Sequence, residues 1–508
     1  MEQDIGLTAG RRRTFTEVVS FALVFSYIVA ILYIIQYHSD ALIDRDSYYH
    51  VRYANLLPSQ GLSHSFPWTQ YSVWRDNFSD KELLFHLYLL PFCGSESSMV
   101  AGGKLAVFML VTIIFYIFYH LLKACSVKMP WLWLILLLSA GNHWLFRMQE
   151  VRPHILSILL MLIGIYCILQ RKYKWLFVVS WLYAWSYAAP QMIVGLAFLD
   201  MVAVYIQERR VELRGVAVSI VGIVAGLVIN PYFPSSLYNW YIINVRILSF
   251  AWGGVGGDRW LSLGAELGPI STRSFLTTSM VIFIVLVIGI CTAIFSKDKL
   301  SRSTASLLFM SGGCFILSCL SAKFVEYLAP VAIWMCASSV TDAVGCRKWG
   351  AILPKNMAGR AICIISFVML VGYLHIVSLS RTLQAVENLP PPNLGGVAGW
   401  IQKNVPAGET IAHLNWSDFT QLYYFNPAHH YIVGLDPMFM YIGYPEESKY
   451  LEGVRLGRIE LIGEDFASMF NTNYLIINKE WNSQYERAKR SGLKIAYEDE
   501  GGAVVILK

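Results

Sequence analysis

The feature that most constrains this chain is a succession of apolar runs separated by short polar breaks. A helix needs about 20 apolar residues to cross the hydrocarbon core of a bilayer, and most of these runs approach that length. An apolar segment at 82–92 is ambiguous between a span and a re-entrant or interfacial helix. We expect about eleven spanning helices, near 15–37, 98–121, 130–146, 155–170, 175–190, 191–207, 215–232, 276–295, 304–321, 325–343 and 361–380.

Composition supports an integral membrane protein. The 508 residues are 56% hydrophobic and only 15% charged, whereas soluble domains are about a quarter charged. The formal charge of +6 is no evidence for a nucleic-acid partner, because membrane proteins collect Lys and Arg in cytoplasmic loops. The nine cysteines lie mostly in apolar runs, without metal-ligand spacing, and are interpreted as buried apolar side chains.

The charges of the polar breaks predict the topology. With a cytoplasmic N-terminus, every second break is basic, as the positive-inside rule requires; these breaks contain Arg11–13, Lys123 and Lys128, "RKYK" (171–174), "RRVELR" (209–214), "SKDKLSR" (296–302) and "RKWGAILPKNMAGR" (347–360). The outer breaks are then 43–97, 147–154, 189–191, 233–275 and 322–327. The C-terminal region is expected outside as well.

The composition changes near residue 380. Residues 385–508 alternate strand-like segments such as "NYLIINK" with helix-like ones such as "SQYERAKRSG". Such alternation is typical of an α/β domain. We therefore predict a polytopic α-helical membrane domain over 1–380 and an extracytoplasmic α/β domain over 385–508.

The first candidate site follows the first apolar run, in "IDRDSYYHVRYANLL" (43–57). Asp44 and Asp46 offer the oxygen ligands that hard divalent cations prefer, and ionised residues at the edge of a bilayer are usually functional. The alternative is an interfacial cap on the first helix, with an aspartate as a helix-end residue and Arg52 extending to the interface.

Two outer breaks carry further acids. Glu150 in "RMQEVRPH" (147–154) is the only acid of a short break, and its alternative is a local salt bridge with a neighbouring arginine. The loop 233–275 contains six glycines between 253 and 269, together with Asp258 and Glu266. Such a loop suits a lid that closes over substrate, or is merely a disordered connection.

Two more elements are candidates for binding. Lys323 in "SAKFVEYLAP" (321–330) can hold a phosphate as a point charge, or can pair with Glu326. Trp416 and Asp418 in "HLNWSDFTQLYYFNP" (413–427) stand at a strand-to-helix junction. They can bind a sugar or peptide, while Asp418 can instead cap the helix.

The order of these features resembles the GT-C superfamily of membrane glycosyltransferases, and most of all the catalytic subunit of oligosaccharyltransferase and its bacterial single-subunit relatives. The sharpest match is "DSYYHVR" (46–52), which is similar to the family motif Asp-x-Tyr-Tyr-His-x-Arg. The resemblance implies that Asp46 binds a divalent metal and the acceptor. It also makes His50 and Arg52 candidate contacts of the donor phosphate.

The other matches are partial. In "MQEVR" only Glu150 stands where the family has an acidic pair, and Glu266 in "GAELGP" matches a glutamate that meets the acceptor. By resemblance, Lys323 and a nearby arginine, Arg152, contact the donor phosphate. The family's Trp-Trp-Asp-Tyr-Gly becomes "NWSDF" (415–419), which keeps Trp416 and Asp418 as acceptor contacts. In the family that element reads an Asn sequon, and here its other Trp and its Gly are missing.

The resemblance implies a transferase that moves a sugar or oligosaccharide from a polyprenyl-(di)phosphate donor to a protein, glycan or lipid acceptor. Catalysis would rest on Asp46 and Glu266, with Mg²⁺ or Mn²⁺ held by Asp46, Glu150 and Asp44. The expected location is a bacterial or archaeal inner or plasma membrane, in contact with membrane lipids. No Gly-rich nucleotide fingerprint follows a strand, which argues against a nucleotide-sugar donor.

Two alternatives remain. The first is a transporter or flippase of a lipid-linked sugar, which predicts ionisable groups in the middle of broken helices; here the charges gather in the breaks. The second is a non-catalytic scaffold of the same fold, for which the incomplete acidic pair leaves room.

Overall fold

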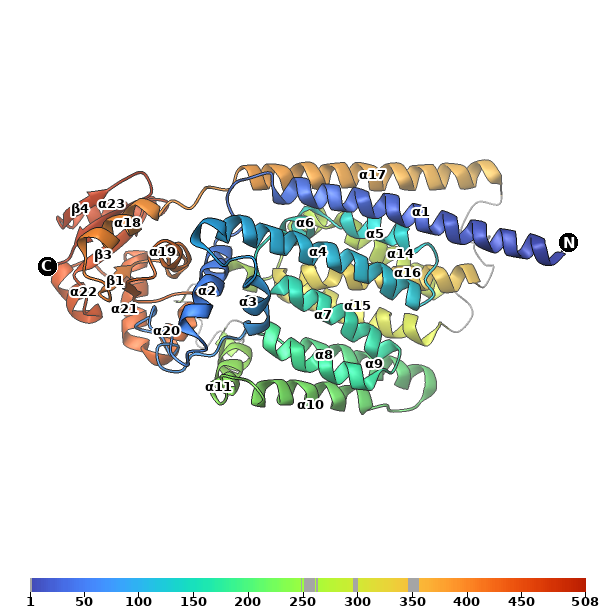
Figure 1. The fold of residues 1–508 in the computed structure, drawn as a ribbon, viewed down its shortest axis with the longest axis horizontal. Coiled ribbons are helices and arrows are strands. Elements are labelled where there is room, and N and C mark those ends of the chain that lie inside the picture. Colours follow the sequence, from blue (N-terminus) through green and yellow to red (C-terminus); the bar gives the residue numbers. More distant parts are fainter. Residues whose placement is uncertain (1, 248, 251–260, 262–263, 296–299, 346–355) are drawn as a thin grey trace. The chain divides into compact units, whose positions relative to one another are not determined.

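The computed structural model describes residues 2–247, 249–250, 261, 264–295, 300–345 and 356–508 (Figure 1). By packing, the chain divides into two compact units, each assembled from three segments. The first comprises Met1–Asp40, Val107–Gly226 and Gly268–Asn388, and the second comprises Ala41–Ala106, Leu227–Leu267 and Leu389–Lys508. The second unit therefore combines the C-terminal α/β region with residues from the long outer breaks.

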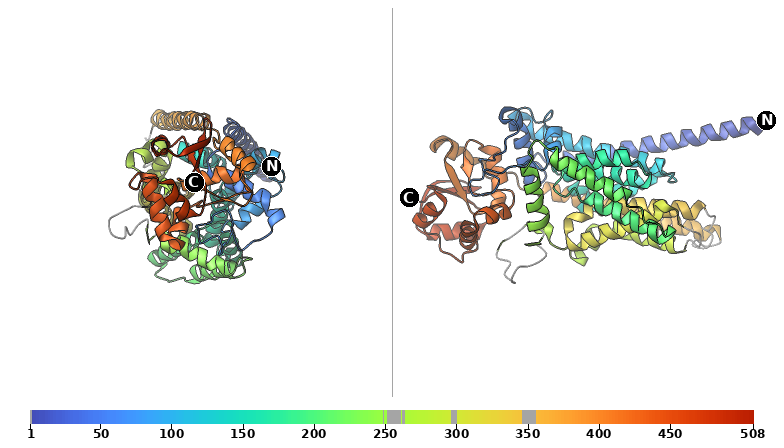
Figure 2. Two further views of the ribbon diagram at one scale, coloured as in Figure 1. Left: turned by 90° about the vertical axis from the view of Figure 1, so that its left-hand side faces the viewer. Right: turned by 90° about the horizontal axis from the view of Figure 1, so that it is seen from below.

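The first unit consists of helices that run roughly side by side (Figures 1 and 2). In chain order they are α1 (Glu2–Gln36), most of α4 (Met99–Ala124), α5 (Pro130–Leu138), α6 (Asn142–Arg147), α7 (His154–Leu169), α8 (Tyr173–Ser186), α9 (Met192–Glu208), α10 (Arg214–Val228), α13 (Thr272–Thr278), α14 (Met280–Phe295), α15 (Arg302–Leu320), η4 (Ala322–Phe324), α16 (Val325–Gly345) and α17 (Met357–Glu387).

Five helical segments of the described chain are long and apolar enough to cross a membrane: Phe15–Gln36, Glu96–Ala124, Arg302–Leu320, Ala322–Val344 and Met357–Glu387. A sixth span results if Thr272–Thr278 and Met280–Ile294, bent by 91°, are taken together. His154–Leu169 and Arg214–Val228 are apolar but shorter. The membrane fold is thus supported, while the total of about eleven spans stays a prediction.

One of the expected spans is an interrupted helix, and the ambiguous segment 82–92 is too short to be a span. Residues 130–146 form two helices, α5 and α6. The helical conformation is interrupted before α6, at Gly141, where φ is 140°. A Cβ on Gly141 would lie 1.9 Å from the carbonyl oxygen of Thr278, so only glycine fits there. The ambiguous segment 82–92 forms the seven-residue helix α3 (Leu83–Leu89), which at about 10 Å is too short to span.

The second unit is centred on a five-stranded sheet of order β2-β1-β3-β5-β4. Its strands are β1 (Thr410–His413), β2 (His430–Tyr431), β3 (Tyr474–Asn478), β4 (Lys494–Glu498) and β5 (Gly502–Ile506). Strand β1 pairs in parallel with β2 and β3, whereas β5 is antiparallel to β3 and β4. Sequence analysis did not predict β4, a half-buried edge strand with an exposed charged residue at each end.

The second unit also contains helices and helical turns. They are α2 (Asp46–Gln60), α3, η1 (Glu96–Ser98), α11 (Ser235–Tyr241), η2 (Ile242–Ile247), η3 (Ala265–Leu267), α18 (Gly395–Asn404), η6 (Trp416–Asp418), α19 (Phe419–Phe425), α20 (Pro437–Gly443), α21 (Pro445–Leu456), α22 (Gly463–Phe470) and α23 (Asn482–Arg490). An apolar core that includes Phe466, Phe470, Leu475 and Val505 fills the space between the sheet and its helices.

The first outer segment runs along the edge of this sheet. The Gln70 amide donates to the Tyr431 carbonyl at 2.8 Å, and the Tyr431 amide donates to the Trp68 carbonyl at 2.9 Å. The Trp68 indole donates to the Pro427 carbonyl at 2.8 Å. These bonds cover the edge of β2, whose backbone groups would otherwise be unpaired, and they fasten the segment that carries α2 to the C-terminal region.

Candidate functional site

The two candidate aspartates lie on either side of the start of α2: Asp44 precedes the helix and Asp46 is its first residue. Asp44 has a left-handed backbone, with φ at 80°, and its Oδ2 accepts a hydrogen bond from the Asp46 amide at 3.2 Å. Asp46 is the first residue of α2 and is half-buried, where the helix dipole favours a negative charge. Asp44 thus caps the start of α2 and not the first helix, which ends at Gln36, and this bond does not account for the Asp46 carboxylate.

Arg52 joins α2 to two other elements of the second unit. Its Nε donates to the Tyr424 carbonyl at 2.7 Å, and its Nη1 donates to Glu96 Oε1 at 2.6 Å. The guanidinium carbon also lies 5.4 Å from the centre of the Tyr424 ring. These contacts show Arg52 as a link between α2, η1 and α19, and its contact with a donor phosphate stays a prediction.

His50 faces a group of buried polar side chains that sequence analysis did not identify. Its Nδ1 lies 2.9 Å from His86 Nε2 and 3.9 Å from Glu82 Oε2. On its other side, His86 Nδ1 lies 2.8 Å from Asp80 Oδ2. The signal was present in "SDKELLFH" (79–86), but that segment was read for its hydrophobicity alone.

Glu150 belongs to an ion-pair cluster of the first unit. Arg147 lies between two carboxylates, with Nη1 at 2.9 Å from Glu150 Oε2 and Nε at 2.8 Å from Glu326 Oε2. Arg152 Nη1 is 3.8 Å from Glu150, and His154 Nε2 is 3.8 Å from Glu326. The local salt bridge considered for Glu150 is therefore present, with Arg147 as its partner.

Lys323 lies in η4, immediately before α16. Its ammonium group lies 5.7 Å from the centre of the Tyr187 ring, a distance at which a cation and an aromatic face attract each other. Glu326, the alternative partner considered for Lys323, forms an ion pair with Arg147 and lies 3.8 Å from His154 Nε2. The contact of Lys323 with a donor phosphate stays a prediction.

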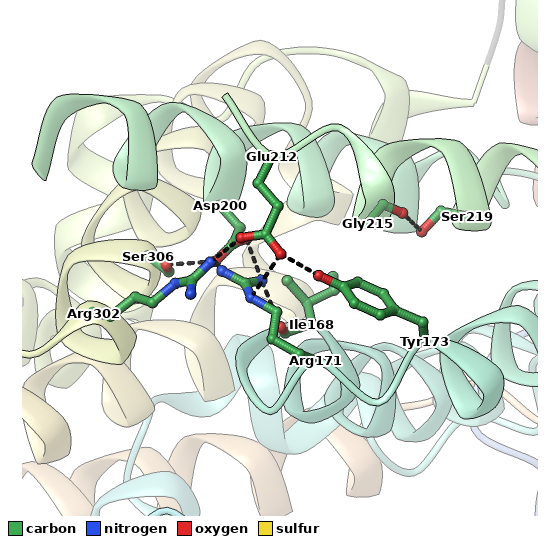
Figure 3. A network of polar contacts seen from close by, with 9 residues as sticks. All are labelled: Ile168, Arg171, Tyr173, Asp200, Glu212, Gly215, Ser219, Arg302 and Ser306. Atoms are coloured by element: carbon green, nitrogen blue, oxygen red, sulfur yellow. Dashed lines mark hydrogen bonds and ion pairs between the residues drawn. The ribbon is translucent and has the colours of Figure 1, made fainter. Parts of the chain in front are cut away.

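A second ion-pair cluster lies at the opposite end of α7, in the basic breaks that were predicted to be cytoplasmic (Figure 3). Helix α7 ends with Arg171 in the left-handed region, at φ 55°, and the Lys172 amide donates back to the Cys167 carbonyl at 2.8 Å, as in a Schellman C-cap. This geometry directs the Arg171 side chain to Asp200 Oδ2 at 2.6 Å. Glu212 in turn binds Arg302.

The late outer loop is described only in part. Glu266 is half-buried in η3, within the second unit. Asp258 and the glycines at 253, 254, 256 and 257 lie outside the described residues. The acceptor role of Glu266 and the closure of this loop stay predictions.

The "NWSDF" element forms the turn η6 between β1 and α19. Trp416 is half-buried and packs against the apolar core of the sheet, whereas Asp418 is buried, and its Oδ1 accepts a hydrogen bond from Asn478 Nδ2 at 2.8 Å. The Asp418 side chain makes no capping bond to α19, so the cap considered for it is absent. Burial raises the pKa of Asp418 to about 6.

This raised pKa predicts that the difference in stability between the wild type and the Asp418→Asn variant depends on pH. In the unfolded chain the carboxyl ionises near pH 4, but in the fold only near pH 6. The wild type therefore loses up to about 3 kcal/mol of stability relative to the variant as the pH rises through this window. Thermal unfolding of the full chain in detergent should give equal Tm values at pH 4, and at pH 7 a Tm several degrees higher for the variant.

The measurement compares the Tm of the wild type with that of the variant at each pH, because the titration of His413 changes the stability of both proteins with pH in the opposite direction. Burial lowers the pKa of His413 to about 4, so its contribution to stability is lost as the pH falls. His413 is unchanged in the Asp418→Asn variant, and its effect cancels. A Tm difference that stays constant from pH 4 to pH 7 would contradict the prediction.

The predicted metal ligands come from both units. Asp44 and Asp46 belong to the second unit, and Glu150 belongs to the first. Within the described ranges, one set of three potential ligands converges, and it consists of His50, Glu82 and His86. The Mg²⁺ or Mn²⁺ site of Asp46, Glu150 and Asp44 stays a prediction.

Solved structures resemble this arrangement over almost the whole chain. An oligosaccharyltransferase of Archaeoglobus fulgidus, in its apo form, aligns with a TM-score of 0.65 over 93% of this chain and 71% of its own, at 12% sequence identity. ArnT of Cupriavidus metallidurans, bound to undecaprenyl phosphate, aligns with a TM-score of 0.55 over 96% of this chain and 98% of its own, also at 12% identity.

The chain has the GT-C fold. No family sequence model matches it, and no curated protein is significantly similar in sequence. The GT-C fold therefore rests on the structural alignments, and the activity has to be argued from the residues of this chain. Among them, Asp46 at the head of α2 is the residue that both its local motif and its half-buried position single out.

Proposed function

We propose that the protein is a glycosyltransferase that moves a sugar or oligosaccharide from a polyprenyl-(di)phosphate donor to an acceptor on the extracytoplasmic face of a bacterial or archaeal membrane. The observation that carries this proposal is the motif "DSYYHVR" (46–52), with Asp46 as the first residue of α2, in a chain with the GT-C fold.

The donor is proposed to be lipid-linked. ArnT of Cupriavidus metallidurans was solved with undecaprenyl phosphate, and AglB of Archaeoglobus fulgidus was solved with an inhibitory peptide and a dolichol-phosphate. Both lipids are polyprenyl phosphates. In this chain Lys323, at the start of an apolar helix, supplies a cation for such a phosphate, with Arg152 as a further candidate.

The proposed acceptor is a peptide, a glycan or a lipid. The oligosaccharyltransferase of Archaeoglobus fulgidus was also solved with a tethered acceptor peptide that contains an NVT sequon. In this chain the corresponding element is "NWSDF", and Asp418 is directed into the domain toward Asn478. A peptide is the first acceptor to test, and glycans and lipids follow.

The proposed reaction is a substitution at the anomeric carbon of the donor sugar. The acceptor nucleophile forms a bond to C1, the bond from C1 to the phosphate oxygen breaks, and the electron pair leaves with the lipid phosphate. The carboxylate of Asp46 or Glu266 takes the proton of the nucleophile. Residues 233–275 would exclude water from the reacting groups.

A divalent cation suits this chemistry. The carboxylates of Asp46, Glu150 and Asp44 are oxygen ligands of the kind that Mg²⁺ and Mn²⁺ prefer. One oxygen of Asp44 already accepts the Asp46 amide, and Glu150 is shared with Arg147, so Asp46 is the central ligand of the proposal. When bound, the ion would offset the charge that grows on the leaving phosphate.

The proposal is tested by incubating the purified full-length protein with lipid-linked sugars extracted from membranes and with a panel of peptide, glycan and lipid acceptors. A glycosylated product identified by mass spectrometry supports it. Movement of the labelled lipid across vesicles without any product would instead support a flippase. If neither a product nor movement of the lipid is observed, the result would support a non-catalytic scaffold.

Removal of divalent cations is expected to lower the transfer rate at least about a hundredfold, since charge stabilisation by a metal ion contributes several kcal/mol. The rate is measured after EDTA treatment and again after addition of excess Mg²⁺ or Mn²⁺, which should restore it. Full transfer in EDTA would exclude the metal role and leave the transferase proposal standing.

A further inference from the structure

The contact between α2 and α3 contains four buried polar side chains that the proposed reaction does not use. His50 comes from α2, while Asp80, Glu82 and His86 come from "SDKELLFH" at the start of α3. The exposed fractions of His50, Asp80, Glu82 and His86 are 4%, 3%, 8% and 0%. One ligand atom from each of His50, Glu82 and His86 lies within 4.8 Å of the other two.

Hydrogen bonding fixes the orientation of His86. A carboxylate can only accept, so His86 Nδ1–H donates to Asp80 Oδ2 at 2.8 Å, and Nε2 of the neutral ring keeps its lone pair. That lone pair accepts a hydrogen bond from His50 Nδ1–H, 2.9 Å away, and an ion bound between the two nitrogens would take the place of this proton. Metal-binding histidines commonly show this arrangement, in which a carboxylate holds the far nitrogen and the near nitrogen binds the ion.

The charges of this group call for a cation. Asp80 and Glu82 bring two carboxylates into a buried place, next to two imidazoles that are neutral when they bind a metal. The ammonium of Lys81 is 3.7 Å from Glu82 Oε1, but its side chain is 28% exposed. Buried carboxylates are stable only when a positive charge or hydrogen bonds compensate them. Asp80 already accepts hydrogen bonds from the His86 ring at 2.8 Å and from the Glu82 amide at 2.9 Å, so a divalent ion among these side chains would chiefly balance the charge of Glu82.

We propose that His50, Glu82 and His86 bind a divalent transition-metal ion of the Zn²⁺ class, with Asp80 orienting His86. Two imidazoles favour Zn²⁺ over Mg²⁺, which prefers oxygen ligands. Tetrahedral Zn²⁺ with bonds of about 2.0–2.1 Å places its ligand atoms about 3.3 Å apart. The separations of 2.9 Å and 3.9 Å around His50 Nδ1 bracket that value.

The ion would position the helix that carries Asp46. Residues four apart lie on the same face of a helix, so His50 stands one turn after Asp46, and its bond to the ion would fix this end of α2 against α3. This proposal assigns His50 to the metal instead of the donor phosphate. It does not depend on the proposed transfer reaction, because its ligands are distinct from Asp46, Glu150 and Asp44.

The test measures metal in the full-length protein, purified in detergent with a tag that contains no histidine. After treatment with a chelator, the apoprotein is titrated with Zn²⁺, and with Co²⁺ as a spectroscopic probe. We expect one tightly bound Zn²⁺ per chain, visible Co²⁺ bands of a tetrahedral site, and a higher Tm with Zn²⁺ but not with Mg²⁺. A wild-type protein that binds neither ion stoichiometrically would overturn the proposal and leave only a hydrogen-bonded cluster.

Variants locate the site. His86→Gln and Glu82→Gln should raise the Kd for Zn²⁺ at least about a hundredfold, and Asp80→Asn should raise it about 10- to 100-fold. His64→Gln changes an exposed histidine of the same segment and should leave the Kd unchanged. Unchanged binding in both His86→Gln and Glu82→Gln would place the ion elsewhere and overturn the proposal. The wild-type titration decides the matter even where a variant fails to fold.

Discussion

Replacement of Asp46 by asparagine is expected to lower the rate of sugar transfer at least about a hundredfold, the loss typical when a charged group that stabilises a transition state is removed. Asparagine keeps the size of the side chain. It also keeps the backbone bond from residue 46 to Asp44 Oδ2, so α2 can begin as before. What it removes is the carboxylate, which both metal binding and proton transfer require. Initial rates with a purified lipid-linked donor, at equal amounts of folded protein, measure the effect.

Asp76→Asn is the matched control. Asp76 lies in the same outer segment, is 65% exposed in its side chain and pairs with Arg75 at 2.8 Å, so the rate should stay within about twofold of the wild type, because exposed pairs contribute little. Full activity of Asp46→Asn would remove Asp46 from the reaction. Equal losses in both variants would show that the segment is merely sensitive to substitution.

The helices were predictable from sequence because membrane-spanning length is a property of each run by itself. Their interruptions were not, because these depend on tertiary contacts. Gly141 breaks a predicted span where its backbone approaches the Thr278 carbonyl, and the two residues are far apart in sequence. In the same way, 82–92 reads as a candidate span by hydropathy, although the chain folds only seven of its residues into α3.

The candidate site shows the same division between local and long-range information. Asp46 was identified because its motif is contiguous. Glu326 was considered as a partner of Lys323, three residues away, but it pairs with Arg147, which is 179 residues away. Asp418 was considered as a local helix cap, but it bonds to Asn478 across the sheet. Sequence reasoning identifies which residues carry chemistry, whereas long-range packing decides their partners.

The basic breaks predicted to be cytoplasmic also take part in an ion-pair network between residues far apart in sequence. They were read for topology alone, yet Arg171 and Arg302 from these breaks meet Asp200 and Glu212 in one network (Figure 3). Asp200 is 4% exposed. Its Oδ2 accepts from Arg171 Nη1 at 2.6 Å, and its Oδ1 accepts from the Ser306 hydroxyl at 2.6 Å. The positive charges of the two guanidinium groups equal the negative charges of the two carboxylates. The loss of one carboxylate therefore leaves one largely buried positive charge without a counter-charge.

Asp200→Ala is therefore expected to destabilise the protein by about 3–5 kcal/mol, the cost of breaking a buried ion pair from one side. Arg171 retains the Ile168 carbonyl at 2.7 Å and the more distant carboxylate of Glu212 at 3.5 Å, and Ser306 loses the acceptor of its hydroxyl. The midpoint of thermal unfolding in mild detergent, followed by tryptophan fluorescence, should fall by about 3–5 °C for a chain of this size.

Two further variants separate charge from packing. Glu446→Ala breaks the exposed pair with Lys449, whose side chains are 80% and 54% exposed, and should change the midpoint by less than about 2 °C. The double variant Arg171→Met with Asp200→Leu removes both charges and fills the space with apolar groups, which often restores the stability that one unpaired charge removes. It should regain most of the loss. A double variant as unstable as Asp200→Ala would mean that the hydrogen bonds to Ser306 and the helix end, and not the unpaired charge, determine the stability of this part of the bundle.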